Sequence, residues 1–74
     1  MDTDKNYNIV TRTPQGVVVD TFPVSTYVPA SAVLTVERAS FASTTEVRGA
    51  PGANSFEYYN QSARQWFRVT VEEV

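Results

Sequence analysis

The stretch SFEYYNQSARQWFRVTV, residues 55–71, holds more than half of the aromatic residues of this 74-residue chain. Read with a period of two, it divides into two β-strands around a polar turn at 60–63, where Asn and Ser are typical turn residues. One face of the two strands carries Tyr59 and Trp66 beside Arg64 and Arg68. The other face is the predicted core face, with Phe56, Tyr58, Phe67, Val69 and Val71.

The Tyr59 and Trp66 face has two interpretations. In the first, Trp66 closes the end of a small core, Tyr59 lies against the sheet, and Glu46 and Glu57 pair with arginines across the strands. In the second, the face is a recognition surface, because Trp, Tyr and Arg dominate binding hot spots. The residues that we predict to contact a protein partner are Tyr59, Arg64, Trp66 and Arg68, with Arg48 at the margin.

The N-terminal part of the chain predicts a β-hairpin. Residues 7–13 alternate as a strand, and 17–22 form a return strand rich in β-branched residues. Between them, Pro14-Gln15-Gly16 supplies a preset φ and a position tolerant of positive φ. Pro23 is expected to end the return strand, because proline cannot donate to a strand ladder, and 24–29 is then an extended connector.

The segment SAVLTVERASF, residues 31–41, fits a helix or a strand. As a helix it has Ser31 as N-cap and an apolar stripe widened by Leu34 and Phe41, although Glu37 interrupts the wide face. We predict the helix, because hairpins alone would leave one sheet face bare. The stripe comprises Ala32, Val33, Val36 and Ala39.

The chain is expected to form one small domain over 1–74, with 1–6 as a flexible leader. Residues 43–48 predict a short strand, and 49–54 a loop that is a second candidate for contact. The predicted fold class is α+β, a small antiparallel sheet of ββαββ type with one helix across one face. A small all-β barrel is the alternative.

Composition limits the chemistry of this chain. It contains no Cys and no His, which excludes disulfides and the usual zinc, haem and iron–sulfur sites, so we expect no metal and no cofactor. General acid–base and covalent catalysis lack their usual side chains, and no phosphate-binding loop is present. We therefore predict a protein that is not an enzyme and has no catalytic residues.

Size and charge bear on partners. A chain this short supports a limited core, so association with a protein partner, or with further copies of itself, is the expected support. The formal charge of −2 argues against nucleic-acid binding by a broad basic face. No apolar run is long enough to span a membrane, and we expect a soluble, intracellular protein, or a virion protein if it is structural.

The order of these segments carries a resemblance. A hairpin is followed by a segment ending in ERAS, then by TTEVR, then by aromatic strands with Tyr59 and Trp66. This layout, over about Tyr7–Val71, resembles small phage-encoded ββαββ proteins, including some anti-CRISPR proteins. The resemblance implies a stoichiometric inhibitor that covers a host complex. Lys5 is the only lysine, whereas Lys-rich faces are common in members that block access to nucleic acid, so protein–protein contact is favoured.

Three functions remain open at this point. The first is a non-enzymatic binding protein of phage or viral type that inhibits a host complex. The second is a structural component of a virion or other assembly, in which Pro23–Pro29 and the chain ends pack on neighbouring proteins. The third is single-stranded nucleic-acid binding by stacking on the aromatic face.

Overall fold

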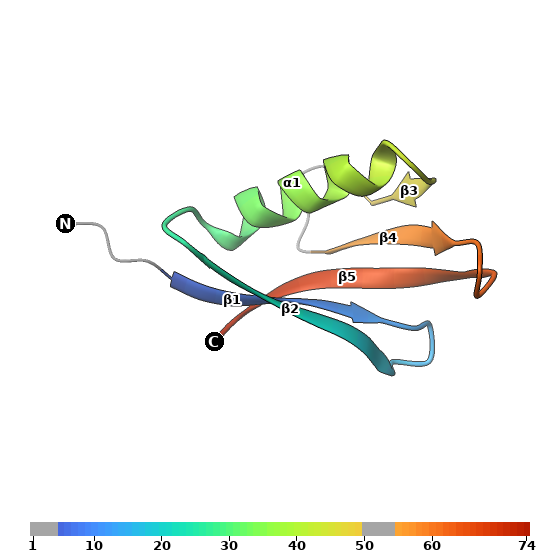
Figure 1. Cartoon of the computed structure of the whole chain (residues 1–74), viewed down its shortest axis with the longest axis horizontal. Helices are drawn as coiled ribbons and strands as arrows, with labels where there is room; N and C mark the ends of the chain where they lie inside the picture. Colours follow the sequence, from blue (N-terminus) through green and yellow to red (C-terminus); the bar gives the residue numbers. More distant parts are fainter. Residues whose placement is uncertain (1–4, 50–54) are drawn as a thin grey trace.

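The computed structural model describes residues 5–49 and 55–74, which form one antiparallel sheet with a helix against one face (Figure 1). Its elements are β1 (Lys5–Arg12), β2 (Val18–Thr26), α1 (Ala30–Ala42), β3 (Val47–Arg48), β4 (Ser55–Asn60) and β5 (Gln65–Glu73). The strand order across the sheet is β2-β1-β5-β4-β3. The predicted α+β class, with one helix across a small antiparallel sheet, is confirmed.

Strand β5 lies at the centre of the sheet, between β1 and β4. Its pairing with β1 joins the two ends of the chain, with Thr11 opposite Val69 and Ile9 opposite Val71. The Val74 backbone N–H continues this pairing by donating to the Asn6 carbonyl at 2.9 Å. Both edges of β5 are therefore occupied, and the sheet depends on contacts between residues far apart in sequence.

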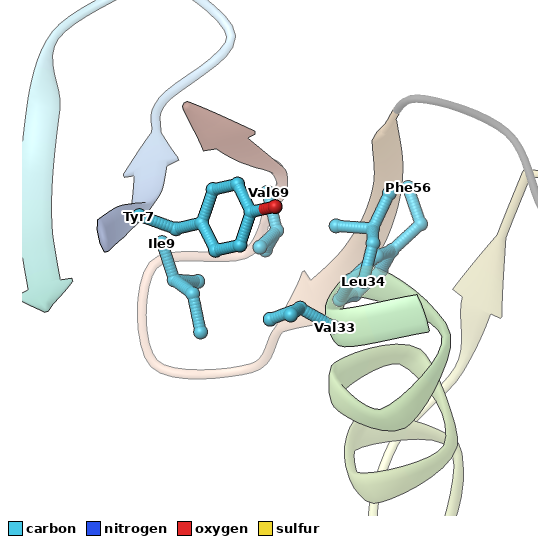
Figure 2. Packing of buried hydrophobic residues seen from close by; sticks show 6 residues of the cluster. All are labelled: Tyr7, Ile9, Val33, Leu34, Phe56 and Val69. Carbon is cyan, nitrogen blue, oxygen red and sulfur yellow. The ribbon is translucent and has the colours of Figure 1, made fainter. Parts of the chain in front are cut away.

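Side-chain alternation along the central strands divides the sheet into two faces. The face under α1 holds the core, in which Val69 is fully buried and Phe56 is only 2% exposed (Figure 2). Tyr7 is also buried there, and its hydroxyl donates to the Val28 carbonyl at 3.2 Å, which attaches the β2–α1 connection to β1. The remaining members of the core cluster are Ile9, Val33 and Leu34.

Helix α1 begins one residue earlier than its predicted cap. Pro29, with extended backbone (φ −70°, ψ 159°), is the N-cap, and its carbonyl accepts from the Ala32 and Val33 backbone N–H groups. The prediction of Ser31 as N-cap is wrong, since Ser31 lies within the first turn and its carbonyl accepts from the Thr35 hydroxyl at 2.8 Å. A proline fits this boundary because it needs no partner for a backbone N–H.

The buried face of α1 also differs from the predicted stripe. Val33 and Leu34 are buried, but Val36 is 68% exposed and Ala39 is exposed. The helix is turned so that Phe41 stacks on Tyr58 of β4, with ring centroids 4.2 Å apart and an interplanar angle of 15°. The aromatic contact thus decides which helix face is buried, and propensity along the helix does not reveal it.

Strand β2 continues through Pro23 to Thr26, so the predicted strand end at Pro23 is wrong. Every second residue of β1, starting at Asn6, directs its backbone N–H and C=O groups toward β5. The backbone groups of Asn8 therefore also point toward β5. Pro23 is the β2 partner of Asn8, so its nitrogen faces the free edge of the sheet, where no N–H is needed. Proline is tolerated because β2 is an edge strand.

Backbone conformation and local hydrogen bonds account for the boundaries of the other elements. The predicted turn at Pro14-Gln15-Gly16 is confirmed, with Gly16 at φ +89° donating to the Thr13 carbonyl at 2.9 Å. The predicted strand at 43–48 is reduced to β3, because Ser43 and Thr44 complete the end of α1. Lys5 and Asn6 of the expected leader belong to β1, and its residues 1–4 lie outside the described residues.

We predict that Leu34→Ala destabilises the protein strongly and that Val36→Ala barely changes its stability. Leu34→Ala should lower the free energy of unfolding by about 2–5 kcal/mol, because it leaves a cavity between α1 and the sheet. Val36→Ala, on the exposed side of the same helix, should change it by less than about 0.5 kcal/mol. Urea unfolding followed by circular dichroism measures both values. Similar losses in the two variants would contradict the helix orientation described above.

Candidate functional site

The sheet face opposite α1 carries the charged and aromatic residues predicted to contact a partner. Register places Trp66 beside Tyr59, Arg68 beside Glu57, and Arg48 beside Glu57 on this face. No described element covers it, and these side chains range from half-buried to exposed. We call this surface the arginine–tryptophan face and define it by Arg12, Arg48, Glu57, Tyr59, Trp66 and Arg68.

An aromatic pair with a cation above it forms the middle of the arginine–tryptophan face. Tyr59 and Trp66 are directly opposite each other on β4 and β5, with ring centroids 5.7 Å apart in an edge-to-face arrangement. The Arg48 Cζ lies 4.1 Å from the Trp66 ring centroid, within the range of a cation–π interaction. The Arg48 Nε also donates to Glu57 Oε1 at 2.9 Å. These contacts hold the indole and the guanidinium in a defined arrangement before any partner binds.

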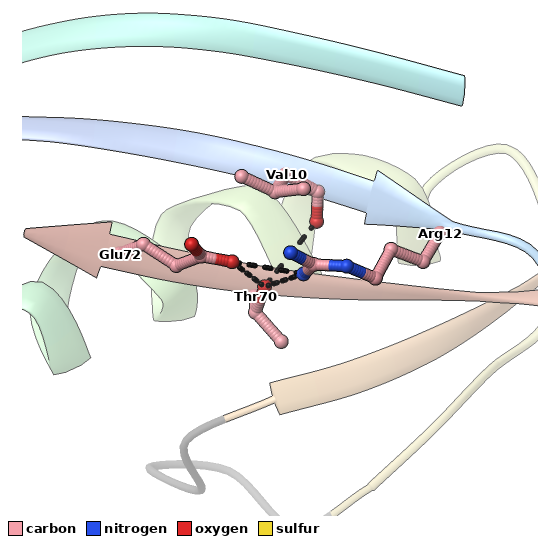
Figure 3. A network of polar contacts seen from close by, with 4 residues as sticks. All are labelled: Val10, Arg12, Thr70 and Glu72. Carbon is pink, nitrogen blue, oxygen red and sulfur yellow. Dashed lines mark hydrogen bonds and ion pairs between the residues drawn. The ribbon is translucent and has the colours of Figure 1, made fainter. Parts of the chain in front are cut away.

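Two arginines of the arginine–tryptophan face oppose each other across β1 and β5. Arg12 and Arg68 are register partners, an arrangement in which like charges repel. Arg12 leans along the sheet instead, and its Nη1 donates to Glu72 Oε2 at 2.8 Å and to Thr70 Oγ1 at 3.2 Å (Figure 3). Within residues 5–49 and 55–74, Arg68 forms no ion pair.

A groove of about 250 Å³ opens between these arginines and the β1–β2 turn. Arg12, Arg68, Glu57 and Trp66 contribute its functional groups, and the turn closes one side. The remaining lining residues are Thr13, Pro14 and Gly16.

The structure brings together four of the five residues predicted as contacts. Trp66 contacts both Tyr59 and Arg48, and Arg68 lies on the same face, beside Trp66 along β5. Arg64 is separate: it is exposed in the β4–β5 turn with a left-handed backbone (φ 55°). Its role in contact stays a prediction. The second candidate, the loop 49–54, lies outside the described residues except for Gly49.

Sequence reasoning did not include Arg12 in the candidate site. Alternation already placed Arg12 on the face opposite Ile9, but its distance from Arg68 along the chain gave no sign that the two strands pair. The interpretation that glutamates pair with arginines of this face is confirmed for Glu57 and Arg48. For Glu46 the structure shows only a backbone contact, in which its carbonyl accepts from the Tyr59 N–H at 3.0 Å.

In residues 5–49 and 55–74, no three His, Cys, Asp or Glu side chains gather in a way that would hold a metal ion. The helix found in the same residues is too short and too polar to cross a membrane.

In comparisons with known proteins, no family model matches this sequence, and no curated protein and no solved structure is significantly similar to it.

We predict that Trp66→Ala leaves the protein folded. The loss should be about 1–2 kcal/mol, the sum of one exposed cation–π contact and one edge-to-face aromatic contact. Phe67→Ala, at the next position on β5 but on the core face, should cost about 3–5 kcal/mol. Chemical unfolding of the two purified variants makes the comparison. An equal or larger loss for Trp66→Ala would show that the indole belongs to the core.

Proposed function

We propose that this chain is a non-enzymatic protein-binding module that acts by covering its partner's surface with the arginine–tryptophan face. The observation that carries the proposal is the cluster of Tyr59, Trp66 and Arg48 on a sheet face that no described element covers. Tyr, Trp and Arg are the residue types that contribute most binding energy at protein interfaces.

Pre-organisation supports the same proposal. An interface side chain that is ordered on binding costs about 0.5–1.5 kcal/mol, and this cost falls when the side chain is already held in place. The Arg48 side chain is held by contacts with Trp66 and Glu57, and the Trp66 side chain is also held by its contact with Tyr59. The face therefore offers large, ordered side chains with polar ends at little entropic cost.

The kind of partner is proposed from the layout of the chain. The hairpin, helix and aromatic strands resemble small phage-encoded inhibitors, including some anti-CRISPR proteins. We propose accordingly that the partner is a bacterial host complex that the chain inhibits stoichiometrically. The arginine–tryptophan face also carries Glu57, and Glu72 pairs with Arg12, which favours a protein surface over a nucleic-acid backbone.

We predict that Trp66→Ala weakens partner binding by about thirtyfold or more, the loss expected for a binding hot spot. The partner would be captured from bacterial extract on the immobilised chain, identified by mass spectrometry, and its affinity measured by calorimetry. In a bacterium with active CRISPR immunity, the wild-type chain should raise the plating of a targeted phage, and Trp66→Ala should not.

Val36→Ala is the matched control, because it removes an exposed apolar side chain from the outer side of α1. It should leave both affinity and plating unchanged. A folded Trp66→Ala variant with full affinity for the same partner would refute the proposed face. If the wild-type chain binds the partner through this face but does not raise phage plating, the inhibitory role alone is refuted.

A specific observation favours a second function, a structural component of an assembly. Strand β2 is a nine-residue edge strand along which apolar side chains are exposed, including Phe22 at 60% and Val19 at 50%, and Tyr27 directly after the strand is 70% exposed. Exposed apolar edge strands tend to pair with other chains. Pro23 removes one donor from the free edge and so limits a continuous ladder there.

We expect the purified chain to be a monomer or a small dimer when its mass is measured by size-exclusion chromatography with light scattering. Under the structural alternative it forms larger assemblies through β2, and Phe22→Lys disperses them. Val36→Lys is the control, since it adds the same charge at a similarly exposed apolar position on α1. Assemblies that Phe22→Lys dissolves and Val36→Lys preserves would favour the structural function.

A further inference from the structure

The opposition of Arg12 and Arg68 across β1 and β5 is unfavourable for the isolated chain. Side chains directly opposite in an antiparallel pair are close neighbours, and two like charges at this position destabilise the sheet. In the free chain the Arg12 Nη1 is held by Glu72 and Thr70 (Figure 3). A feature that destabilises the free protein is expected at a site where a bound ligand restores the lost stability.

The charges around the groove leave one positive charge unmatched. Arg12 is paired with Glu72, and Glu57 is paired with Arg48. Arg68 forms no ion pair within the described residues, although it stands directly opposite Glu57. Both groove arginines also keep N–H donors, since a guanidinium has five and the ion pair of Arg12 runs through Nη1.

The shape of the groove restricts what enters it. Trp66 provides an apolar surface beside the two guanidinium groups, and the β1–β2 turn limits the space to about 250 Å³. One unmatched positive charge suits a carboxylate, which carries one negative charge and accepts from guanidinium forks. Inorganic phosphate carries between one and two negative charges at neutral pH, about −1.5 to −2 for a phosphomonoester, which exceeds the one unmatched positive charge of the groove.

We infer that the groove between Arg12, Arg68 and Trp66 binds a carboxylate, the side chain of a glutamate or aspartate on the surface of the protein partner. Both guanidinium groups donate to its oxygens, and its aliphatic stem lies against the indole. The inference rests on the proposed protein-binding function and specifies the chemistry that the partner presents at this face.

The test does not need the partner itself. A ¹⁵N-labelled sample of the full chain is titrated with the peptide acetyl-Leu-Glu-Leu-amide, with acetyl-Leu-Gln-Leu-amide, and with inorganic phosphate. The side-chain Nε–H signals of Arg12 and Arg68 and the indole N–H signal of Trp66 are followed by NMR. The glutamate peptide should shift all three signals saturably, and the glutamine peptide should bind about tenfold more weakly.

Three variants test where the peptide binds. Arg68→Gln should weaken binding of the glutamate peptide about tenfold, and Arg68→Lys, which keeps the charge but loses the planar fork, should fall between it and the wild type. Arg64→Gln removes an equal charge from the neighbouring turn, outside the groove lining, and should change affinity less than about twofold. Backbone spectra of each variant establish that it is folded.

Four results would overturn the inference. Equal affinity for the two peptides would show that the carboxylate is not recognised. A loss of affinity in Arg64→Gln equal to that in Arg68→Gln would show diffuse electrostatic attraction instead of a site. Saturable binding of phosphate without binding of the glutamate peptide would assign the groove to a phosphate ligand. If the glutamate peptide does not bind while Trp66→Ala still abolishes partner binding, the carboxylate assignment is wrong and the proposed function is retained.

Discussion

The structure depends on the register of β5 between β1 and β4. Val69 is fully buried in this strand, with Thr11 of β1 and Phe56 of β4 as its neighbours, so the strand cannot shift by one residue without exchanging its two faces. With Val69 under α1, Trp66 and Arg68 must point to the opposite side. The same register that buries the core therefore also builds the candidate binding face.

A second constraint is that the helix of the described chain is too short to cover the whole sheet. The 13-residue helix packs against β5, β4 and β3, and it leaves β2 largely uncovered. Two surfaces of this small chain are consequently open to other molecules, the arginine–tryptophan face and the apolar edge strand. They differ in character: the first is charged and held by defined contacts, while the second offers the exposed Phe22, with the exposed Tyr27 directly after the strand. This difference is why recognition is proposed for the first and assembly for the second.

Local patterns in the sequence predicted much of this arrangement, and non-local contacts account for what they missed. The two-residue period of the aromatic stretch correctly placed Phe67 and Trp66 on opposite faces, and Pro14 and Gly16 identified the first turn. The pairing of β1 with β5 has no local signal, so Arg12 was not joined to the site. The helix was expected to bury Val36, but the stacking of Phe41 on Tyr58 sets its rotation.

The register of β5 can be measured directly, because the chain has no cysteine to interfere with thiol labelling. Single cysteines would be placed in turn at positions 66 to 71, and their reaction with a water-soluble thiol reagent followed by mass spectrometry under native conditions. We predict a period of two, in which positions 66, 68 and 70 react readily and positions 67, 69 and 71 react slowly. An inverted pattern, or equal reactivity along the strand, would contradict both the core and the binding face described here.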